Sequence, residues 1–492
     1  MEIFPDFEEF KSLSKKVNVI PFHTWFLADF ETPVTSFLKI AKGSYNFLLE
    51  SAEQEEKTGR YSFIGSYPEI IIKGKENRVE ITDYTKGIIE KFEEKNSLKI
   101  IDDFLKKYST VKIKPLPSFT GGFVGFVSYD YVRNIEKIPQ ICKDDLSIPD
   151  FIFFFPKKLI IFDHFKRKIF LITNVFVEKN KTLKQIYDEG KENLLKFTGE
   201  FFKSFKVIER KVEEKNDDFK SNFKKEEFLK NVEKVKKYIF EGDIIQAVIS
   251  QRWEREIDTE VFKIYRALRS LNPSPYMFYL ELGDLKLIGS SPEILVKLEN
   301  GIANVRPIAG TRPRGKDEKE EKKLEEELVN DEKEKAEHIM LVDLGRNDLG
   351  KVCYPGTVRV TELMKIEKYS HVMHLVSNVE GKLMKNKSSV DLFNSTFPAG
   401  TLTGAPKIRA MEIIEELEGV RRGPYGGAVG YFSLQKSMDF CITIRTFIIK
   451  GKKIYIQAGA GIVADSVPEK EYEETENKAK ALIESYNFSK RI

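Results

Sequence analysis

Cysteine is scarce in this sequence: Cys142, Cys353 and Cys441 are the only three in 492 residues. They are widely spaced and form no CxxC pair, so the chain carries no disulfide framework. Proteins without structural disulfides are typical of a reducing compartment, and we therefore expect a cytoplasmic protein. The shortage also excludes zinc sites made from cysteine clusters, and no HExxH motif offers a histidine-based site instead.

The sequence also lacks a strong excess of charge of either sign. The chain has 81 Lys and Arg against 77 Asp and Glu, a net charge of +4. Nucleic acids and anionic membranes attract proteins through concentrated basic surface, so we expect neither as a partner. No stretch approaches the roughly 20 apolar residues of a membrane-spanning helix, and acidic residues occupy the first positions, where a signal peptide would be basic.

Several nucleotide and hydrolase motifs are absent as well. The sequence has no GxxxxGK[ST] loop, no GxSxG elbow and no GxGxxG motif between a strand and a helix. P-loop, α/β-hydrolase and dinucleotide-binding sites therefore have no support.

What the sequence does contain is typical of a folded protein, with 41% hydrophobic and 12% aromatic residues. Residues 45–51 and 60–65 are predicted strands, and residues 150–156 and 168–177 flank a polar turn and predict a hairpin. Residues 228–241 and 316–344 each predict one helix. Helices alternate with strands, so we expect a mixed α and β fold.

The composition changes at residues 203–227, which are crowded with Lys, Glu, Asp and Asn. We interpret this stretch as a solvated linker. It divides the chain into an N-terminal part, residues 1–215, and a second part, residues 216–492. Whether the first part folds by itself or is interlocked with the second stays open, and we favour interlocking.

Residues that can carry chemistry are concentrated between positions 289 and 478. Residues 307–315 (PIAGTRPRG) predict a tight turn with two arginines. Residues 397–407 (FPAGTLTGAPK) lead into a helix that Thr403 or Gly404 can cap, and the start of a helix offers N–H groups to an anion.

Further along, Arg445 alternates with apolar neighbours in a predicted strand, and a buried arginine needs an anion. Residues 457–462 (QAGAGI) predict a strand end where a ligand can approach bare backbone. Residues 466–469 (SVPE) predict a capping box that opens a final helix, on which Glu474 and Lys478 share a face. Taken singly these features are commonly structural. Together they describe a pocket for a small polyanion and a hard divalent cation such as Mg²⁺.

Six long motifs resemble those of the chorismate-utilising enzyme family. They are PIAGTRPRG, EHIMLVDLGRNDLGKV, VMHLVSNVEG, FPAGTLTGAPK, YGGAVGYF and QAGAGIVADSVPEKEYEETENKAKA. The resemblance covers nearly the whole chain. It implies a mixed α+β fold in which two large antiparallel-rich β-sheets pack as a sandwich and are wrapped by helices. It also implies an enzyme that displaces the 4-hydroxyl group of chorismate in a Mg²⁺-dependent step.

Within the family, the resemblance is to the large subunits that add ammonia to C2 of chorismate and eliminate pyruvate. The product, anthranilate, begins tryptophan biosynthesis. The resemblance implies that Glu337 and Glu474 hold Mg²⁺, that Glu293 protonates the departing hydroxyl, and that His374 removes the C2 proton. The substrate contacts it implies are Arg445, Tyr425, Thr401, Gly310, Thr311 and the backbone of Gly459, Ala460 and Gly461, with Lys478 as a further candidate.

Two positions distinguish members of the family. Aminodeoxychorismate synthases commonly carry a nucleophilic Lys where this chain has Ala309, and the water-adding members carry a Lys base where it has Gln246. An amide is not a general base at neutral pH, so both residues favour added ammonia as the nucleophile. Two alternatives stay open: an aminodeoxychorismate synthase component I, and a non-catalytic tryptophan-binding relative.

The resemblance also implies feedback inhibition by L-tryptophan. Its site would combine Ser51, in the segment LLES, with Pro275, Tyr276 and Met277, in the segment NPSPYM. Binding there would favour an arrangement of the two parts that excludes chorismate.

The ammonia source is expected on another chain, because a glutaminase needs a nucleophilic cysteine and none of the three lies in a Gly-x-Cys-x-Gly elbow. We therefore expect a glutamine amidotransferase subunit as partner. The resemblance suggests a heterotetramer of two large and two small subunits.

Overall fold

The computed structural model describes residues 2–51, 59–178, 180–203, 218–368 and 372–492. In this part of the chain, 22 strands belong to one hydrogen-bonded network, and all pairings between the strands are antiparallel. The predicted boundary between residues 215 and 216 lies outside the described residues.

Two long strands, β3 (Tyr61–Lys75) and β7 (Phe151–Asp163), divide the network into two sheets. Their pairing is interrupted between Pro68 and Ile70, so each strand contributes its two halves to different sheets. The sequence of β7, FIFFFPKKLIIFD, is an almost continuous apolar run because the strand is buried on both faces. The mixed α and β class and the predicted hairpin, formed by β7 and β8 (Lys168–Phe176), are confirmed.

The first sheet is built around the N-terminal half of β3 and the C-terminal half of β7. Its strands follow in the spatial order β1 (Val19–Leu27), β8, β7, β3, β2 (Tyr45–Glu50), β11 (Tyr276–Leu282), β12 (Leu285–Ser291), β21 (Thr446–Lys450), β22 (Lys453–Ile462) and β10 (Gln246–Glu256). Two short strands, β9 (Lys220–Ser221) and β18 (Gly404–Ala405), pair with β10.

The second sheet contains the other halves of β3 and β7. Its order is β5 (Ile88–Glu93), β4 (Arg78–Asp83), β3, β7, β6 (Gly122–Val127), β19 (Ala428–Ser433), β20 (Met438–Ile442), β13 (Ile294–Glu299), β14 (Ile302–Val305), β17 (Val372–Lys382) and β16 (Arg359–Lys368). One further strand, β15 (Ile308–Pro313), pairs with β17 on the same side as β14.

A hydrophobic core fills the space between the two sheets. Phe47, Phe278 and Ile448 reach it from the first sheet, and Phe126 and Val429 reach it from the second. Each is at most 2% exposed. Fully burying such a side chain contributes about 1.5–3 kcal/mol, so this layer is a major reason why the sheets stay together.

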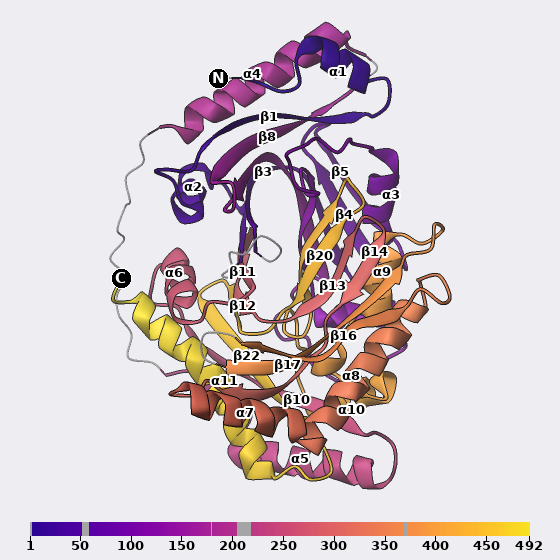
Figure 1. Ribbon diagram of the computed structural model, residues 1–492, viewed down its shortest axis with the longest axis vertical. Helices are drawn as coiled ribbons and strands as arrows, with labels where there is room; N and C mark the ends of the chain where they lie inside the picture. Colours follow the sequence, from indigo (N-terminus) through magenta and orange to yellow (C-terminus); the bar gives the residue numbers. More distant parts are fainter. Residues whose placement is uncertain (1, 52–58, 179, 204–217, 369–371) are drawn as a thin grey trace.

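Helices cover the outer faces of both sheets (Figure 1). Their bounds are α1 (Phe7–Leu13), α2 (Pro33–Ile40), α3 (Lys99–Lys107), α4 (Leu183–Phe201), α5 (Lys225–Phe240), α6 (Val261–Leu271), α7 (Glu318–Asn330), α8 (Glu332–Gly350), α9 (Ser389–Thr396), α10 (Lys407–Leu417) and α11 (Pro468–Ser489), with 3₁₀ turns η1 (Tyr129–Asn134) and η2 (Gly400–Leu402).

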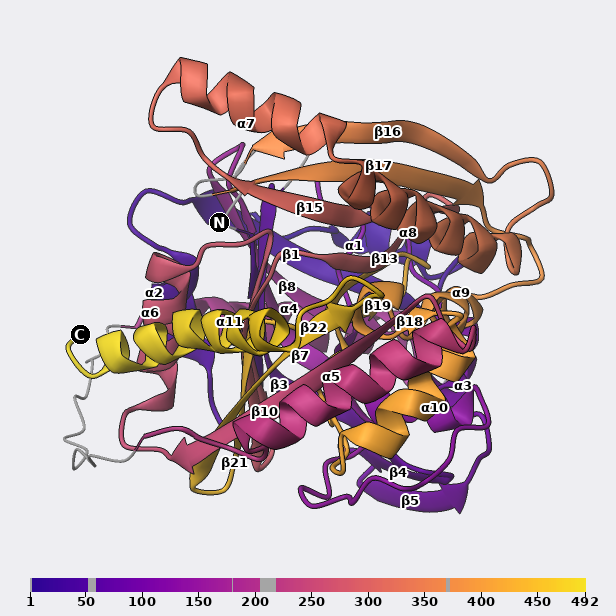
Figure 2. The same cartoon turned by 90° about the horizontal axis from the view of Figure 1, so that it is seen from below.

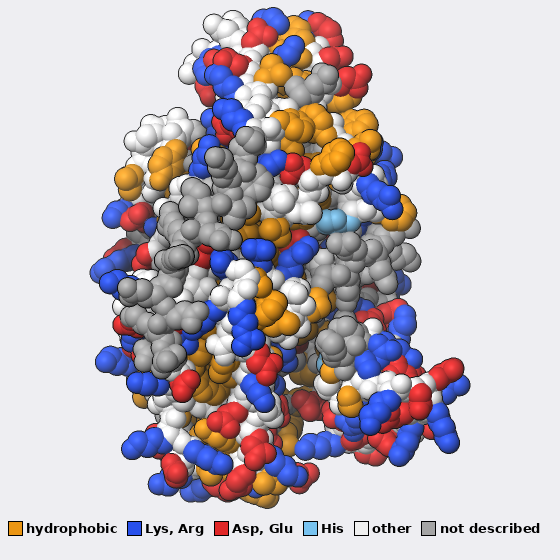
Figure 3. All heavy atoms as spheres, turned by 90° about the vertical axis from the view of Figure 1, so that its left-hand side faces the viewer, with side chains coloured by type: hydrophobic (Ala, Val, Ile, Leu, Met, Phe, Trp, Pro, Cys, Tyr) orange, Lys and Arg blue, Asp and Glu red, His pale blue; other side chains and the backbone are white. Residues whose placement is uncertain are grey.

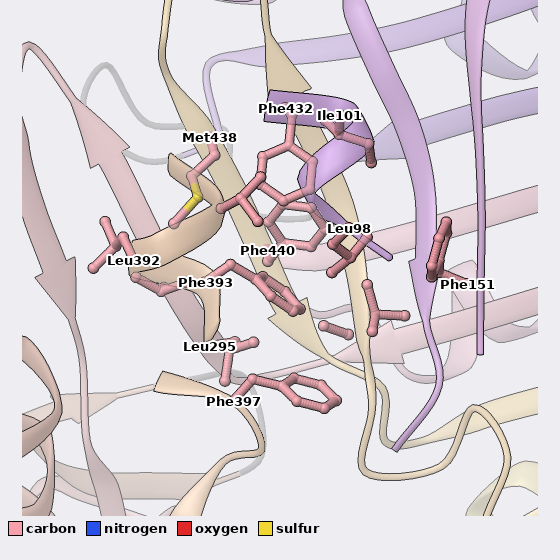
Figure 4. Close-up of a cluster of buried hydrophobic side chains, with 14 of the residues drawn as sticks. Leu98, Ile101, Phe151, Leu295, Leu392, Phe393, Phe397, Phe432, Met438 and Phe440 are labelled. Atoms are coloured by element: carbon pink, nitrogen blue, oxygen red, sulfur yellow. The ribbon is translucent and has the colours of Figure 1, made fainter. Parts of the chain in front are cut away.

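Apolar clusters join the helices to the sheets. α1, α2, α4, α6 and α11 pack on the first sheet through Phe10, Phe37, Leu194, Tyr265 and Leu482. α3 and α9 pack on the second sheet, where Figure 4 shows Ile101, Leu392 and Phe393 gathered around Phe432 and Phe440. α5 and α10 lie side by side against β10 (Figure 2).

The surface agrees with the balanced composition. Figure 3 shows basic and acidic side chains intermingled on one face of the molecule, in the part of it that is described. No helix in the described ranges is long and apolar enough to cross a membrane.

The predicted single helix over residues 316–344 is wrong. The chain forms two helices, α7 and α8, which meet at Asp331. The backbone of Asp331 is extended, and its carboxylate accepts hydrogen bonds from the N–H groups of Lys333 and Glu334. A side chain that caps a new helix competes with continuation of the old one, and charge periodicity does not reveal it.

Both predicted helix caps are wrong as well. Pro406 is the N-cap residue of α10, because Gly404 and Ala405 pair with β10 instead of capping the helix. Val467 is the N-cap of α11, and the hydroxyl of Ser466 accepts a hydrogen bond from Val463 N instead. In both cases a contact outside the helix, distant in sequence for Gly404 and local for Ser466, occupies the residue that was expected to cap.

Candidate active site

Glu293 lies in the two-residue connection between β12 and β13, at the boundary between the two sheets. Its carboxylate accepts a hydrogen bond from Thr401 Oγ1 in η2 at 2.9 Å. Burial raises the pKa of Glu293 to about 7, against the opposite effects of this hydrogen bond and of the charge of Lys478. The carboxyl can therefore hold a proton near neutral pH, as a general acid must.

A small cavity of about 60 Å³ adjoins Glu293 and Thr401. Leu341 and Asp348 of α8 form part of its wall, and Arg306 forms another part. The wall is largely apolar, which accounts for the desolvation of the Glu293 carboxyl.

Glu337 and Glu474 approach each other from two different helices, α8 and α11. Burial raises the pKa of Glu337, and the negative charge of Glu474 raises it further. Gln246 Nε2 donates to Glu337 Oε1 at 3.4 Å, and Lys478 Nζ lies 2.6 Å from Glu474 Oε1.

The pair is a suitable donor set for Mg²⁺. Two carboxylates that repel each other are stabilised by a cation between them. No group of three or more His, Cys, Asp or Glu in the described ranges is arranged to hold a metal ion. Two protein carboxylates are enough for Mg²⁺, which usually takes one or two and completes its shell with substrate and water.

The strand end predicted at residues 457–462 is the last half of β22. Lys478 Nζ donates to the carbonyl of Gly459 at 2.9 Å, which ties α11 to this strand. A Cβ atom at Gly459 would lie 2.9 Å from Tyr425 Oη, and one at Gly461 would lie 2.5 Å from Gln246 Nε2. Gly459 needs glycine, because a Cβ there would also lie 2.7 Å from the backbone carbonyl oxygen of Ile249, whereas at Gly461 only the end of the Gln246 side chain would have to move. Ala460 is buried against α5 and α10, so only its backbone is available to a ligand here.

Arg445 is not in a strand, contrary to the prediction. It lies between β20 and β21 with a left-handed φ of 49°, and this conformation turns the chain from one sheet to the other. Burial lowers the pKa of its guanidinium. Arg445 and Lys478 border one cavity of about 370 Å³, together with Glu474. Two cations and a carboxylate proposed as a metal ligand at one cavity match a polyanion bound with a metal ion.

His374 lies on β17 directly opposite Thr311 of β15. Its Nδ1 is 2.9 Å from the carbonyl of Gly310 and 3.1 Å from Thr311 Oγ1. Donation from Nδ1–H to the carbonyl places the lone pair on Nε2. Burial lowers the pKa of His374, and the nearby charge of Arg445 lowers it further, so the ring is neutral at pH 7 and can act as a base.

The predicted turn at residues 307–315 is wrong, because most of it is strand β15. A bulge interrupts the pairing between Ala309 and Thr311, and Gly310 occupies it with φ of 69°. The glycine and prolines that suggested a turn therefore mark a bulge, which aims the Gly310 carbonyl at His374.

The two halves of the predicted tryptophan site come together. β2 pairs with β11 so that Glu50 lies opposite Met277, and Ser51 follows Glu50 directly. Pro275 precedes β11. Tyr276 pairs with Ser291, and its hydroxyl donates to Asp439 Oδ1 at 3.0 Å. The Met277 side chain is 2% exposed.

One buried ion pair beside the site was not predicted from the sequence. Arg422 and Glu418 lie just after α10 and are 1% and 3% exposed. Their four-residue spacing was the signal, but it is far more common on helix surfaces. Only the fold shows that both side chains are buried.

None of the three cysteines has the surroundings of a nucleophile. All are free and buried. Burial raises the pKa of each thiol, that of Cys353 to about 11. A thiol with a raised pKa carries little thiolate and is a poor nucleophile at neutral pH.

Comparison with known proteins identifies the class. Residues 44–484 match the chorismate binding enzyme family. The chain belongs to this family and is an enzyme of it.

Within the family, similar sequences indicate which kind of enzyme the chain resembles. Anthranilate synthase component 1 of Acetivibrio thermocellus is 47% identical over 488 residues, which cover 98% of each chain. That of Aquifex aeolicus is 48% identical over 486 residues, covering 98% of this chain and 97% of that one. The resemblance drawn from the six motifs is therefore confirmed.

Solved structures support the fold. The crystal structure of anthranilate synthase component I from Streptococcus pneumoniae has a TM-score of 0.75 and 36% identity, and covers 93% of this chain and 98% of that one. A menaquinone-specific isochorismate synthase from Escherichia coli has a TM-score of 0.69 at 21% identity, covers 97% of this chain and 98% of that one, and shares the fold alone. The predicted fold is thus confirmed.

Proposed function

We propose that this chain is the large subunit of an anthranilate synthase and converts chorismate and ammonia into anthranilate and pyruvate. The observation that carries the proposal is the 47% identity to an anthranilate synthase component 1 over 98% of both chains. Ala309 and Gln246, which lack an amine that could act as nucleophile or base, support ammonia as the attacking group.

The residues divide the chemistry between the two steps. Glu293, protonated near neutral pH, gives its proton to the departing 4-hydroxyl as ammonia attacks C2. Neutral His374 then accepts the C2 proton at Nε2 as the pyruvate group leaves and the ring becomes aromatic. Arg445 binds a substrate carboxylate, and a charge-assisted pair of this kind is worth about 1.5–3 kcal/mol.

Thr401, Gly310, Thr311, Tyr425 and the backbone of residues 459–461 complete the substrate contacts in this proposal. Their role is to hold chorismate so that its C2 and C4 face the acid and the base. Four contacts support it: Thr401 bonds to Glu293, Gly310 and Thr311 contact His374, and the carbonyl of Gly459 accepts from Lys478.

We infer that Glu337 and Glu474 hold Mg²⁺. The ion, when bound, neutralises substrate carboxylate charge in the way a Lewis acid does. Gln246 orients Glu337 by donating to it, and Lys478 orients Glu474.

Ammonia is supplied by a separate glutamine amidotransferase subunit in this proposal. The raised thiol pKa values support it, because they leave the described chain without a glutaminase nucleophile. The assembly we propose is a heterotetramer of two large and two small subunits.

L-tryptophan, the end product of the pathway, is the proposed feedback inhibitor. Ser51, Pro275, Tyr276 and Met277 form its site. Tyr276 pairs with Ser291, two residues before Glu293, so the inhibitor would act close to the acid.

The test is a product assay with the purified chain, chorismate, Mg²⁺ and an ammonium salt, with and without L-tryptophan. We expect anthranilate, detected by its fluorescence, and less of it with tryptophan. Formation of 4-amino-4-deoxychorismate or isochorismate alone would reject the proposal. Tryptophan binding without turnover would indicate a non-catalytic relative.

A further inference from the structure

Arg422 is a buried cation that the proposed chemistry does not use. It is 1% exposed and lies between the end of α10 and Tyr425. A guanidinium has five N–H donors, and burying it without partners is costly. Its hydrogen-bond partners therefore indicate which segments of the chain it joins.

The guanidinium contacts one carboxylate and two backbone carbonyls. Nε and Nη2 donate to the two oxygens of Glu418 at 2.8 and 2.6 Å. Nη1 donates to the carbonyl of Leu402 at 2.6 Å, and Nη2 donates to that of Val248 at 2.7 Å. Arg422 thus joins η2 to β10.

The contact with Leu402 leads directly to the acid. Leu402 follows Thr401 in η2, and Thr401 donates to Glu293. A second tie holds the same segment, because Val248 N donates to the carbonyl of Thr403 at 2.8 Å. The position of the Thr401 hydroxyl therefore depends on how η2 is attached to β10.

Glu418 and the aromatic rings fix the guanidinium from the other sides. Glu418 Oε1 accepts from the N–H and the hydroxyl of Ser250 at 2.8 and 2.7 Å. The guanidinium carbon lies 4.6 Å from the ring centre of Tyr129 and 5.6 Å from that of Tyr425. A planar, bidentate and stacked guanidinium is a role that lysine cannot fill.

We propose that Arg422 and Glu418 are positioning residues for catalysis: they hold η2 against β10 so that Thr401 keeps the Glu293 carboxyl in its working position. The inference rests on the proposed role of Glu293 as the acid. It adds that the position of the Glu293 carboxyl depends on an ion pair that does not touch the substrate.

The first experiment compares Arg422→Lys with wild type, using chorismate, Mg²⁺ and ammonium salt. We expect kcat to fall on the order of 10- to 100-fold, because small displacements of a catalytic group have effects of this size. The KM for chorismate is expected to stay within about twofold, because the substrate contacts are intact.

The matched control is Arg255→Lys. Arg255 is also buried and paired with an acid, Asp258, and its guanidinium carbon lies 4.8 Å from the ring centre of Tyr486. It lies on β10 but makes none of the contacts with η2. We expect this substitution to change stability without changing kcat.

A double-mutant cycle separates positioning from general stability. Thr401→Val removes the hydroxyl that Arg422 is proposed to place. If Arg422 acts through Thr401, the double variant has the kcat of the slower single variant instead of the product of both losses.

The pH profile gives an independent readout. The Thr401 hydrogen bond lowers the pKa of Glu293, so its loss raises that pKa. The decline of activity at high pH should move to higher pH in Arg422→Lys and Thr401→Val alike, relative to wild type at equal free ammonia. The other charged groups facing Glu293, which are Lys478, Arg306 and Asp348, are unchanged in both variants.

Three outcomes would overturn the inference: a folded Arg422→Lys variant with wild-type kcat and pH profile, additive losses in the cycle, or an equal loss in Arg255→Lys. If Arg422→Lys does not fold, Arg422→Gln with Glu418→Gln removes both charges together and avoids an unpaired buried ion. Failure of that variant to fold would show a purely structural pair. Absence of anthranilate with wild type would instead reject the proposed function.

Discussion

At the scale of single residues, Glu293 owes its expected role to its surroundings. A carboxyl in water is ionised at neutral pH, whereas burial raises the pKa of Glu293 to about 7. His374 is shifted in the opposite direction by the same burial. An acid that keeps its proton and a base that stays neutral can therefore work at one pH.

The Glu293 carboxyl predicts the pH dependence. A proton donor must be protonated, so kcat/KM at constant free ammonia should fall as pH rises through about 7. Glu293→Gln should lower kcat by about 10²- to 10⁴-fold and abolish this decline. Steady-state rates between pH 6 and 9 test it. Asp284→Asn, in the exposed turn at the far end of β12, is the control and should behave as wild type.

Glu474 gives a second prediction at this scale. Glu474→Gln removes one of the two carboxylates proposed to hold Mg²⁺ and should raise the Mg²⁺ concentration needed for half-maximal activity by about 10-fold or more. Titration of activity with MgCl₂ measures it. The same substitution at exposed Glu484, also on α11, should leave the Mg²⁺ requirement unchanged, and an unchanged requirement in Glu474→Gln would refute the ligand role.

At the scale of elements, the site depends on irregular segments between regular ones. η2 carries Thr401, a bulge in β15 aims the Gly310 carbonyl at His374, and a left-handed residue places Arg445 between two strands. Such segments are held by the elements around them, and their conformations are restricted at a few backbone positions.

Gly404 is one of these positions. It has φ of 142°, and a Cβ atom there would lie 2.0 Å from the carbonyl oxygen of Gln246. Gly404→Ala should therefore destabilise the protein by about 1–3 kcal/mol from overpacking, beyond the roughly 1 kcal/mol of an unfavourable φ. Gly419→Ala is the matched control, because Gly419 also has a positive φ of 71° but nothing lies within 4 Å. Thermal unfolding should show a larger decrease in Tm for Gly404→Ala.

The pairing of β2 with β11 predicts the behaviour of the tryptophan site. Ser51→Phe places a large ring where the amino acid is proposed to bind, so the tryptophan concentration for half inhibition should rise at least about 10-fold, a loss of about 1.4 kcal/mol of binding. Anthranilate formation without tryptophan should persist. Ser12→Phe, at an exposed position of α1, is the control, and unchanged inhibition in Ser51→Phe would argue against the site.

At the scale of the whole molecule, the two sheets are inseparable. β3 and β7 run through both, so strands from the first 180 residues and from the last 250 share one network. This network places β2, near the N-terminus, beside β11, whose first residue pairs with Ser291 two residues before Glu293.

The isolated chain should use ammonia but not glutamine. Its three cysteines are buried and have raised pKa values, so none of them is suited to act as a glutaminase nucleophile. Anthranilate formation should require an ammonium salt, and adding a glutamine amidotransferase subunit should make glutamine effective. Glutamine-dependent activity of the purified chain alone would contradict the prediction.

The fold class, one hairpin and the family of this protein could be predicted from the sequence alone. The mixed fold, the β7–β8 hairpin and the family follow from patterns that are local along the chain or from motifs long enough to be recognised. Prediction was wrong where a competing contact is not visible in the periodicity of the sequence. The local cap at Asp331 ends a helix that charge spacing would continue, and Gly404 pairs with the distant strand β10 instead of capping α10.

Only the tertiary structure decided the chemistry of the site. The raised pKa of Glu293 depends on a cavity wall from α8, the approach of Glu337 to Glu474 depends on two helices far apart in sequence, and the role of Arg422 depends on its complete burial. Burial and long-range electrostatics arise from how the sheets and helices pack, and side-chain spacing along the chain does not contain them.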